Sequence, residues 1–157
     1  MKLFISITFL TTFILPGCSK EKNLYNESAS FSDSTKIANV LEEKVITTMS
    51  DKNEKTMSTL YGNDIAAEYA RSSSDKHYPA GSELSLVTWF QKEDIHWFGA
   101  AIPGKIKSVE IVKYTGNNSN SSYVCYAGNL LKLQEKSVAE NMERTSIIIS
   151  LKAAVLP

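Results

Sequence analysis

The sequence predicts an α+β fold, with a single domain built on a mostly antiparallel sheet and a few helices. Three observations predict it. Residues 82–90 and 107–114 alternate side chains in the manner of strands. The polar segment GNNSNSS at 116–122 separates the second of these from another short aromatic and β-branched stretch, as in a hairpin. Asn63 and Asp64 precede an alanine-rich stretch, where a helix N-cap is expected.

The N-terminus has the pattern of an export signal. Lys2 is followed by an apolar run over 3–15, and Pro16 and Gly17 then precede Cys18. A basic start, an apolar run and a small residue before the cleavage point are typical of such signals. The run is too short for a membrane-spanning helix, which needs about 20 apolar residues. We therefore predict a signal peptide over residues 1–17.

Residues 15–18, LPGC, also resemble the bacterial lipobox, in which the cysteine becomes the lipid-carrying first residue of the mature protein. Pro16 is less usual at its position, and an ordinary secretory signal that contains a cysteine is the alternative. We predict lipid attachment at Cys18, because two or three acyl chains such as palmitate, at about 0.8 kcal/mol per buried CH₂, hold a protein stably on a membrane. Ser19 then favours the outer membrane by the common sorting rule.

Length and charge limit the classes of function. Removal of the 17-residue signal from 157 residues leaves 140, which is enough for one domain with a core. The mature chain keeps 16 basic residues against 17 acidic ones, since Lys2 is removed from the 17 basic residues of the full chain. A nucleic-acid-binding domain is usually strongly basic, so we expect no nucleic-acid partner. The expected location is the cell envelope, with the lipid anchor as the contact to the membrane.

Residues 18–35 are polar and lack apolar periodicity, so we predict a lipidated tether there and a folded domain over 36–157. Cys125 has no disulfide partner if Cys18 is acylated. It lies in a strand-like segment among large apolar residues, where a cysteine is more often buried packing than a nucleophile.

The first half of the domain gives four local predictions. Ile37, Val40 and Leu41 lie near helical spacing, whereas residues 44–49 are β-branched and fit a strand equally well. Residues 55–61 alternate as a half-buried strand does. A short helix over 65–71 follows the cap residues.

The second half is richer in strands. A turn is predicted at 78–81, and residues 82–90 are apolar on both faces, so that strand is expected to be central. Residues 92–94 are a polar break, and 102–105 read as another turn. A hairpin is predicted from 107 to 127, ending at Gly128. Beyond it, a helix is predicted from about Ser137, but residues 147–149 are β-branched and leave a change to a strand open.

Chemistry-bearing residues gather in the segment 93–99. If it were a strand, Asp94 and His96 would project from one face, where the carboxylate would orient the imidazole for general acid or base work. The alternative is that Trp97 and Phe98 anchor the core while the polar pair caps a bend. The chain has two histidines and no C-x-x-C pair, so no metal site is expected.

Three segments together resemble the cytochrome P460 family over about residues 56–128. They are TLYGNDIA at 59–66 followed by Ala70 and Arg71, YPAGS at 78–82 leading into LVTW at 86–89, and SVEIV at 108–112. The resemblance implies a compact α+β domain on an antiparallel sheet, a homodimer and export from the cytoplasm. Haem-bearing members attach haem through C-x-x-C-H near the C-terminus. This chain has RTSI at 144–147 there, so covalent haem attachment and the associated oxidase activity do not carry over.

The sequence thus predicts a membrane-tethered lipoprotein with a haemless, cytochrome P460-like domain that acts as a binding or envelope-interaction module. Asp94, His96 and Trp97 are the candidate binding residues, with Trp89 and Phe98 beside them in any pocket. No catalytic residue is assigned. The alternatives are an oxidoreductase that binds haem non-covalently through His96, or a hydrolase centred on Asp94 and His96.

Overall fold

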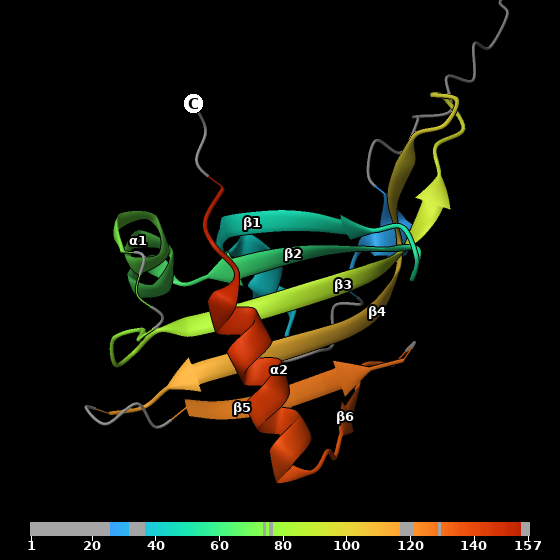
Figure 1. Ribbon diagram of the computed structural model, residues 1–157. Coiled ribbons are helices and arrows are strands. Elements are labelled where there is room, and N and C mark those ends of the chain that lie inside the picture. Colours follow the sequence, from blue (N-terminus) through green and yellow to red (C-terminus); the bar gives the residue numbers. More distant parts are fainter. Residues whose placement is uncertain are drawn as a thin grey trace, which may run out of the picture.

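The computed structural model describes residues 26–31, 37–73, 75, 77–116, 121–128 and 130–154. In this part of the chain, six strands form one antiparallel sheet in sequence order, β1-β2-β3-β4-β5-β6. The predicted α+β class and antiparallel sheet are confirmed (Figure 1). The predicted signal peptide and Cys18 lie outside the described residues. None of the described helices is long and apolar enough to cross a bilayer.

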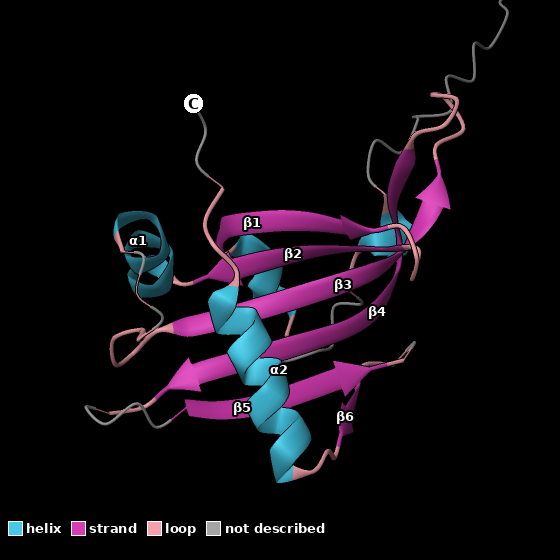
Figure 2. Cartoon of the chain, in the orientation of Figure 1, coloured by secondary structure: helices cyan, strands magenta, loops and turns pink. Residues whose placement is uncertain are grey.

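Helices lie on both faces of the sheet (Figure 2). The strands are β1 (Lys44–Asp51), β2 (Thr56–Gly62), β3 (Glu83–Glu93), β4 (Ala101–Tyr114), β5 (Ser121–Ala127) and β6 (Lys132–Gln134). The helices are η1 (Glu27–Ala29) and η2 (Ala38–Glu42), both 3₁₀, and the α-helices α1 (Asp64–Ser72) and α2 (Val138–Ser150).

The apolar alternation of β3 builds two cores, one on each face. Leu84 and Leu86 point to the face that α1 and α2 cover, where Ile148 of α2 is fully buried. Val87 and Trp89 point to the opposite face, where they pack with the N-terminal segment that contains η1 and η2. The prediction of a central strand with two apolar faces is confirmed.

Two expectations for the sheet were wrong. Residues 102–105 are not a turn but part of β4, and β3 continues to Glu93 to pair with them. Pro103 has no backbone N–H to donate, and it is tolerated because the pairing register is irregular between Thr88 and Gln91. Gly104 is required there, since a Cβ would lie 2.9 Å from the carbonyl oxygen of Phe90.

The hairpin predicted over 107–127 is confirmed by the pairing of β4 with β5, and its turn residues 117–120 lie outside the described part. The short strand β6 was not predicted. The strand alternative near residue 147 is wrong, because α2 continues to Ser150. Between Ile37 and Glu43 the short η2 forms, and the strand alternative for 44–49 is confirmed by β1.

Part of the predicted tether lies against the sheet. The side-chain amide of Asn26 donates to the carbonyl of Pro103 at 2.6 Å, and the indole N–H of Trp89 donates to the carbonyl of Ala29 at 2.9 Å. Phe31 packs against the second core. The packed part of the chain therefore includes residues 26–31, which precede the predicted boundary at residue 36.

Candidate functional site

A groove of about 520 Å³ lies beside α2, on the sheet face that this helix crosses. Residues of all six strands line its floor. One wall is formed by Arg144 and Ile147 of α2 and by Leu151, the residue that follows α2. This volume lies within the range of small-molecule sites. Apolar side chains from the sheet, among them Met49 and Leu86, line it together with charged ones.

Glu110 is the buried charged residue on the floor of the groove. It lies on β4 two residues before Val112, so the strand alternation places it on the face that α2 covers. Only 3% of the residue is exposed. A carboxylate at such a depth is costly unless it is paired and hydrogen-bonded, so its neighbours determine what the groove contains.

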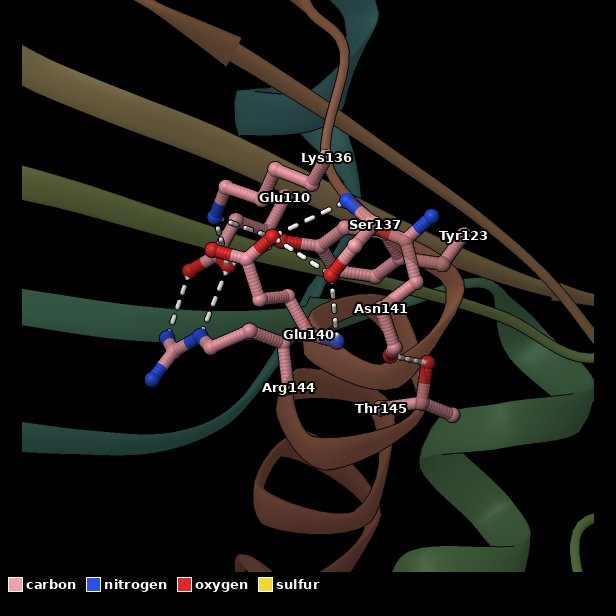
Figure 3. Close-up of polar contacts among 8 residues, drawn as sticks. All are labelled: Glu110, Tyr123, Lys136, Ser137, Glu140, Asn141, Arg144 and Thr145. Atoms are coloured by element: carbon pink, nitrogen blue, oxygen red, sulfur yellow. Dashed lines mark hydrogen bonds and ion pairs between the residues drawn. The ribbon is translucent and has the colours of Figure 1, made fainter.

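Arg144 of α2 supplies the main partner of Glu110 (Figure 3). Its Nε donates to Oε1 at 2.9 Å and its Nη2 donates to Oε2 at 2.6 Å, a two-pronged pairing. The hydroxyl of Tyr123, on β5, donates to Oε1 as well. The pair thus joins the C-terminal helix to the middle of the sheet.

The local sequence fixes α2 in a position that allows this contact. Ser137 caps the helix, since its hydroxyl accepts from the backbone N–H of Glu140, and the Glu140 carboxylate accepts from the Ser137 backbone N–H at 2.9 Å. This reciprocal pair is a capping box. Arg144 lies one turn after Glu140, and Ile148 one turn later enters the core.

The electrostatics of the pair follow from its surroundings. Burial alone would raise the pKa of Glu110, but the hydrogen bonds from Arg144 and Tyr123 outweigh it and the pKa is lowered. The hydrogen bond to Glu110 also raises the pKa of Arg144. Burial, followed by the hydrogen bond to Glu110, raises the pKa of Tyr123. At neutral pH the site therefore holds a carboxylate, a guanidinium and a neutral phenol.

Lys136 adds a positive charge beyond the ion pair of Glu110 with Arg144. Its Nζ lies 3.9 Å from Oε1 of Glu110 and 3.4 Å from the hydroxyl of Tyr123. Both oxygens of Glu110 already accept hydrogen bonds from Arg144 at 2.9 Å or less. An ammonium has three N–H donors, so Lys136 retains capacity to bind an anion from the groove.

The charges that line the groove are three cations, Lys107, Lys136 and Arg144, against two carboxylates, Asp51 and Glu110. Lys107 approaches Glu54 at 3.5 Å with both side chains exposed. Asp51 accepts backbone N–H bonds from the β1–β2 turn, at Asn53 and Glu54. With Glu110 paired to Arg144 and Lys107 close to Glu54, the groove combines apolar walls with the ammonium of Lys136, an arrangement suited to an organic anion.

The residues predicted from the sequence lie elsewhere. Asp94 and His96 are in the loop between β3 and β4, so of the two alternatives the strand face is wrong and the capped bend is confirmed for this pair. The Asp94 carboxylate accepts from the backbone N–H of His96 at 2.8 Å, so it caps the bend. Trp97 is 71% exposed and Phe98 fully exposed, so neither anchors the core. Trp89 is buried in the second core, whereas Trp97 and Phe98 face solvent, so the structure does not bring the three side chains together.

Arg144 and Ile147 lie three positions apart on α2, and both line the groove. Cys125 is buried in β5, as predicted, and also lines it. The histidines lie in loops outside the groove: His96 before β4, and His77, which pairs with Asp75 at 2.7 Å. Across the described ranges, no three His, Cys, Asp or Glu side chains gather as metal ligands would.

Sequence reasoning missed Glu110 and Arg144 as a pair. One signal was present: Glu110 is a charged residue on a strand face shared with Val112, where an apolar side chain is expected. Its partner follows 34 residues later, and nothing local connects the two.

No protein-family model matches this chain, and no curated protein matches it in sequence. Its function is therefore inferred from the geometry described above.

Proposed function

We propose that the chain is a lipid-anchored protein of the bacterial envelope whose domain binds a small amphipathic organic anion in the groove beside α2. Cys18 is the anchor in this proposal, and the domain retains a cytochrome P460-like fold without covalently attached haem. The homodimer that the resemblance implies belongs to the same proposal. The role is binding, and no reaction is assigned.

The observation that carries the proposal is the ammonium of Lys136, which lies near Glu110 while both oxygens of that carboxylate already accept hydrogen bonds from Arg144. Arg144 neutralises the charge of Glu110, and Arg144 and Tyr123 both donate hydrogen bonds to it. Lys136 is about one third exposed and borders an opening with apolar walls. A carboxylate ligand would accept from Lys136 while its apolar part contacts Leu86 and Ile147.

Charge and apolar burial both contribute to the expected selectivity. A charge-assisted hydrogen bond contributes about 1.5–3 kcal/mol, and each buried CH₂ about 0.8 kcal/mol. An uncharged analogue of the same length keeps the contribution of the buried CH₂ groups and loses that of the charge-assisted hydrogen bond. The enzyme alternatives gain no support from this groove, since Asp94 and His96 are not among its lining residues.

The first prediction tests this site with a defined probe. Octanoate is titrated calorimetrically into the processed chain carrying Cys18→Ser, with octanol as the uncharged analogue. We expect octanoate to bind at least about tenfold more tightly than octanol, and Lys136→Met to weaken octanoate about tenfold, which corresponds to about 1.4 kcal/mol. Octanol binding should change little in this variant.

The matched control is Lys92→Met, because Lys92 is an exposed lysine that does not line the groove. This control should leave octanoate binding unchanged. Equal affinities for octanoate and octanol, or an unchanged octanoate affinity in Lys136→Met, would contradict the proposed site.

A further inference from the structure

A second feature of the molecule is an exposed apolar cluster in the loop that connects β3 to β4. Three large side chains of this loop, called here the hairpin tip (residues 94–100), face solvent: Ile95 is 86% exposed, Trp97 71% and Phe98 fully. The arm of β3 and β4 that carries the tip bends away from the rest of the sheet (Figure 1). Contiguous exposed apolar side chains of this kind mark interaction sites.

The tip has a defined turn structure that holds these side chains outward. The backbone N–H of Asp94 donates to the carbonyl of Ala100 at 3.0 Å, and the N–H of Ala100 donates to the carbonyl of Trp97 at 3.0 Å. Gly99 has φ +78°, a conformation that favours glycine. The loop thus pairs its own polar backbone groups while it exposes its apolar side chains.

The N-terminal segment meets the sheet at the base of the same arm. Asn26 donates to the carbonyl of Pro103, and Pro103 pairs with Gln91 across the arm. Nearby, Trp89 donates to the carbonyl of Ala29. In Figure 1 the blue η1 lies where β3 and β4 turn away from the sheet. The N-terminal segment therefore meets the domain at the base of the arm that carries the hairpin tip.

We propose that the hairpin tip docks on the membrane that carries the lipid anchor, with Ile95, Trp97 and Phe98 inserted between headgroups and acyl chains. The inference rests on the lipid anchor of the proposed function. Fully extended, the chain from Cys18 to Asn26 spans at most about 28 Å. Fully extended, the chain from Pro103 back to Phe98 spans about 17 Å. The anchor thus limits how far the base of the arm can lie from the membrane surface. This limit is of the same order as the distance from the base of the arm to its tip.

The three side chains have the chemistry that this interface selects. Tryptophan is enriched at the headgroup level, because its ring is apolar and its indole N–H still finds a polar partner. Phenylalanine and isoleucine gain by leaving water for the acyl region. Docking on a lipid surface also explains why these apolar side chains lie at the end of an arm, because they must project beyond the rest of the domain to insert.

Tryptophan fluorescence tests the contact, because the chain has two tryptophans and Trp89 is buried in the protein core. The full lipidated protein is reconstituted into phosphatidylcholine vesicles with or without brominated acyl chains, which quench tryptophans in contact with them. We expect the bromolipid to reduce the Trp97 emission at least about twofold. Trp97→Phe should abolish this quenchable component. Phe98→Asp, a change at a fully exposed side chain, should reduce the quenching while the protein stays folded.

Flotation of the same vesicles on a density gradient distinguishes a failure of the docking from a failure of the lipid anchor. Protein that floats, but whose Trp97 emission is insensitive to bromolipid and is quenched by aqueous iodide, overturns the docking and leaves the anchor intact. The same result would be obtained if the tip served a protein partner instead. Protein that does not float overturns the anchor together with the docking, whereas octanoate binding by the groove is measured in solution and is unaffected.

Discussion

At the scale of single residues, the half-buried Glu43 and the buried Glu110 are two carboxylates with different neighbours. Glu110 has Arg144 and Tyr123 within hydrogen-bond distance, and its pKa is lowered. Glu43 follows η2, and one of its oxygens is buried without a hydrogen-bond partner. Burial, and then the charge of Glu83, raises the pKa of Glu43 to about 7, although Lys113 acts in the opposite direction. The same physical effect therefore leaves one carboxylate ionised and the other close to half protonated at neutral pH.

Glu43 gives a prediction on pH and stability. Its pKa is raised from 4.5 to about 7, so its contribution to stability is fully present below pH 4.5 and is lost as the pH rises through 7. Glu43→Gln should remove this loss, and its stability relative to wild type should increase between pH 5 and pH 8. Urea unfolding at the two pH values measures the difference. Glu42→Gln changes an exposed neighbour and is the control; a Glu43→Gln difference that is equal at both pH values would contradict the prediction.

At the scale of elements, each α-helix begins at a cap that the sequence displays. Ser137 and Glu140 form the capping box of α2. The β-branched residues 147–149 remain helical because Ile148 is fully buried against the sheet, and tertiary burial outweighs a modest strand preference. Asn63 caps α1 and also holds the start of β3, since its Oδ1 accepts from Ala66 and its Nδ2 donates to the carbonyl of Gly81 at 2.7 Å.

The double role of Asn63 is testable with two substitutions. Asn63→Ala removes both the cap and the link to Gly81, and should cost about 1–2 kcal/mol of the free energy of unfolding. Asn63→Asp keeps a cap acceptor and loses only the donor, so it should cost less than the alanine variant. Denaturant unfolding at pH 7 measures both. Equal losses in the two variants would mean that the cap contributes nothing and the link to Gly81 everything.

At the scale of the whole molecule, the sheet has two covered faces, and different parts of the chain cover them. α1 and α2 follow strands and cover the first face. The second is covered by the segment that precedes β1, in which Ile37 and Val40 are buried against Val87 and Trp89. This segment is therefore a structural layer of the domain as well as the connection to the N-terminus.

The contribution of this layer can be measured by deleting a side chain from it. Ile37→Ala should lower the free energy of unfolding by about 2–5 kcal/mol, because it removes a buried side chain and leaves a cavity. Asn39→Ala, at an exposed position two residues later in η2, is the matched control and should change little. Thermal or urea unfolding provides the comparison. A loss below about 0.5 kcal/mol for Ile37→Ala, a size typical of surface changes, would show that the second face does not depend on this segment.

The sequence by itself determined the features that depend on neighbouring residues. The alternation in β3 and β4, the hairpin of β4 and β5 and the caps of α1 and α2 are local patterns, because side-chain periodicity, turns and N-cap bonds involve residues a few positions apart. The sequence placed a turn at 102–105 because Pro103 and Gly104 are turn residues elsewhere, and only the neighbouring strand β3 shows that they pair.

The tertiary structure alone decided what lies next to what. Glu110 meets Arg144 across 34 positions, and Trp89 meets Ala29 across 60. These contacts depend on the register of the sheet and on where α2 and the N-terminal segment dock, neither of which has a local signal. For the same reason, the aromatic segment around Trp97 suggested a pocket from the sequence, whereas the fold places it at the end of an arm in solvent.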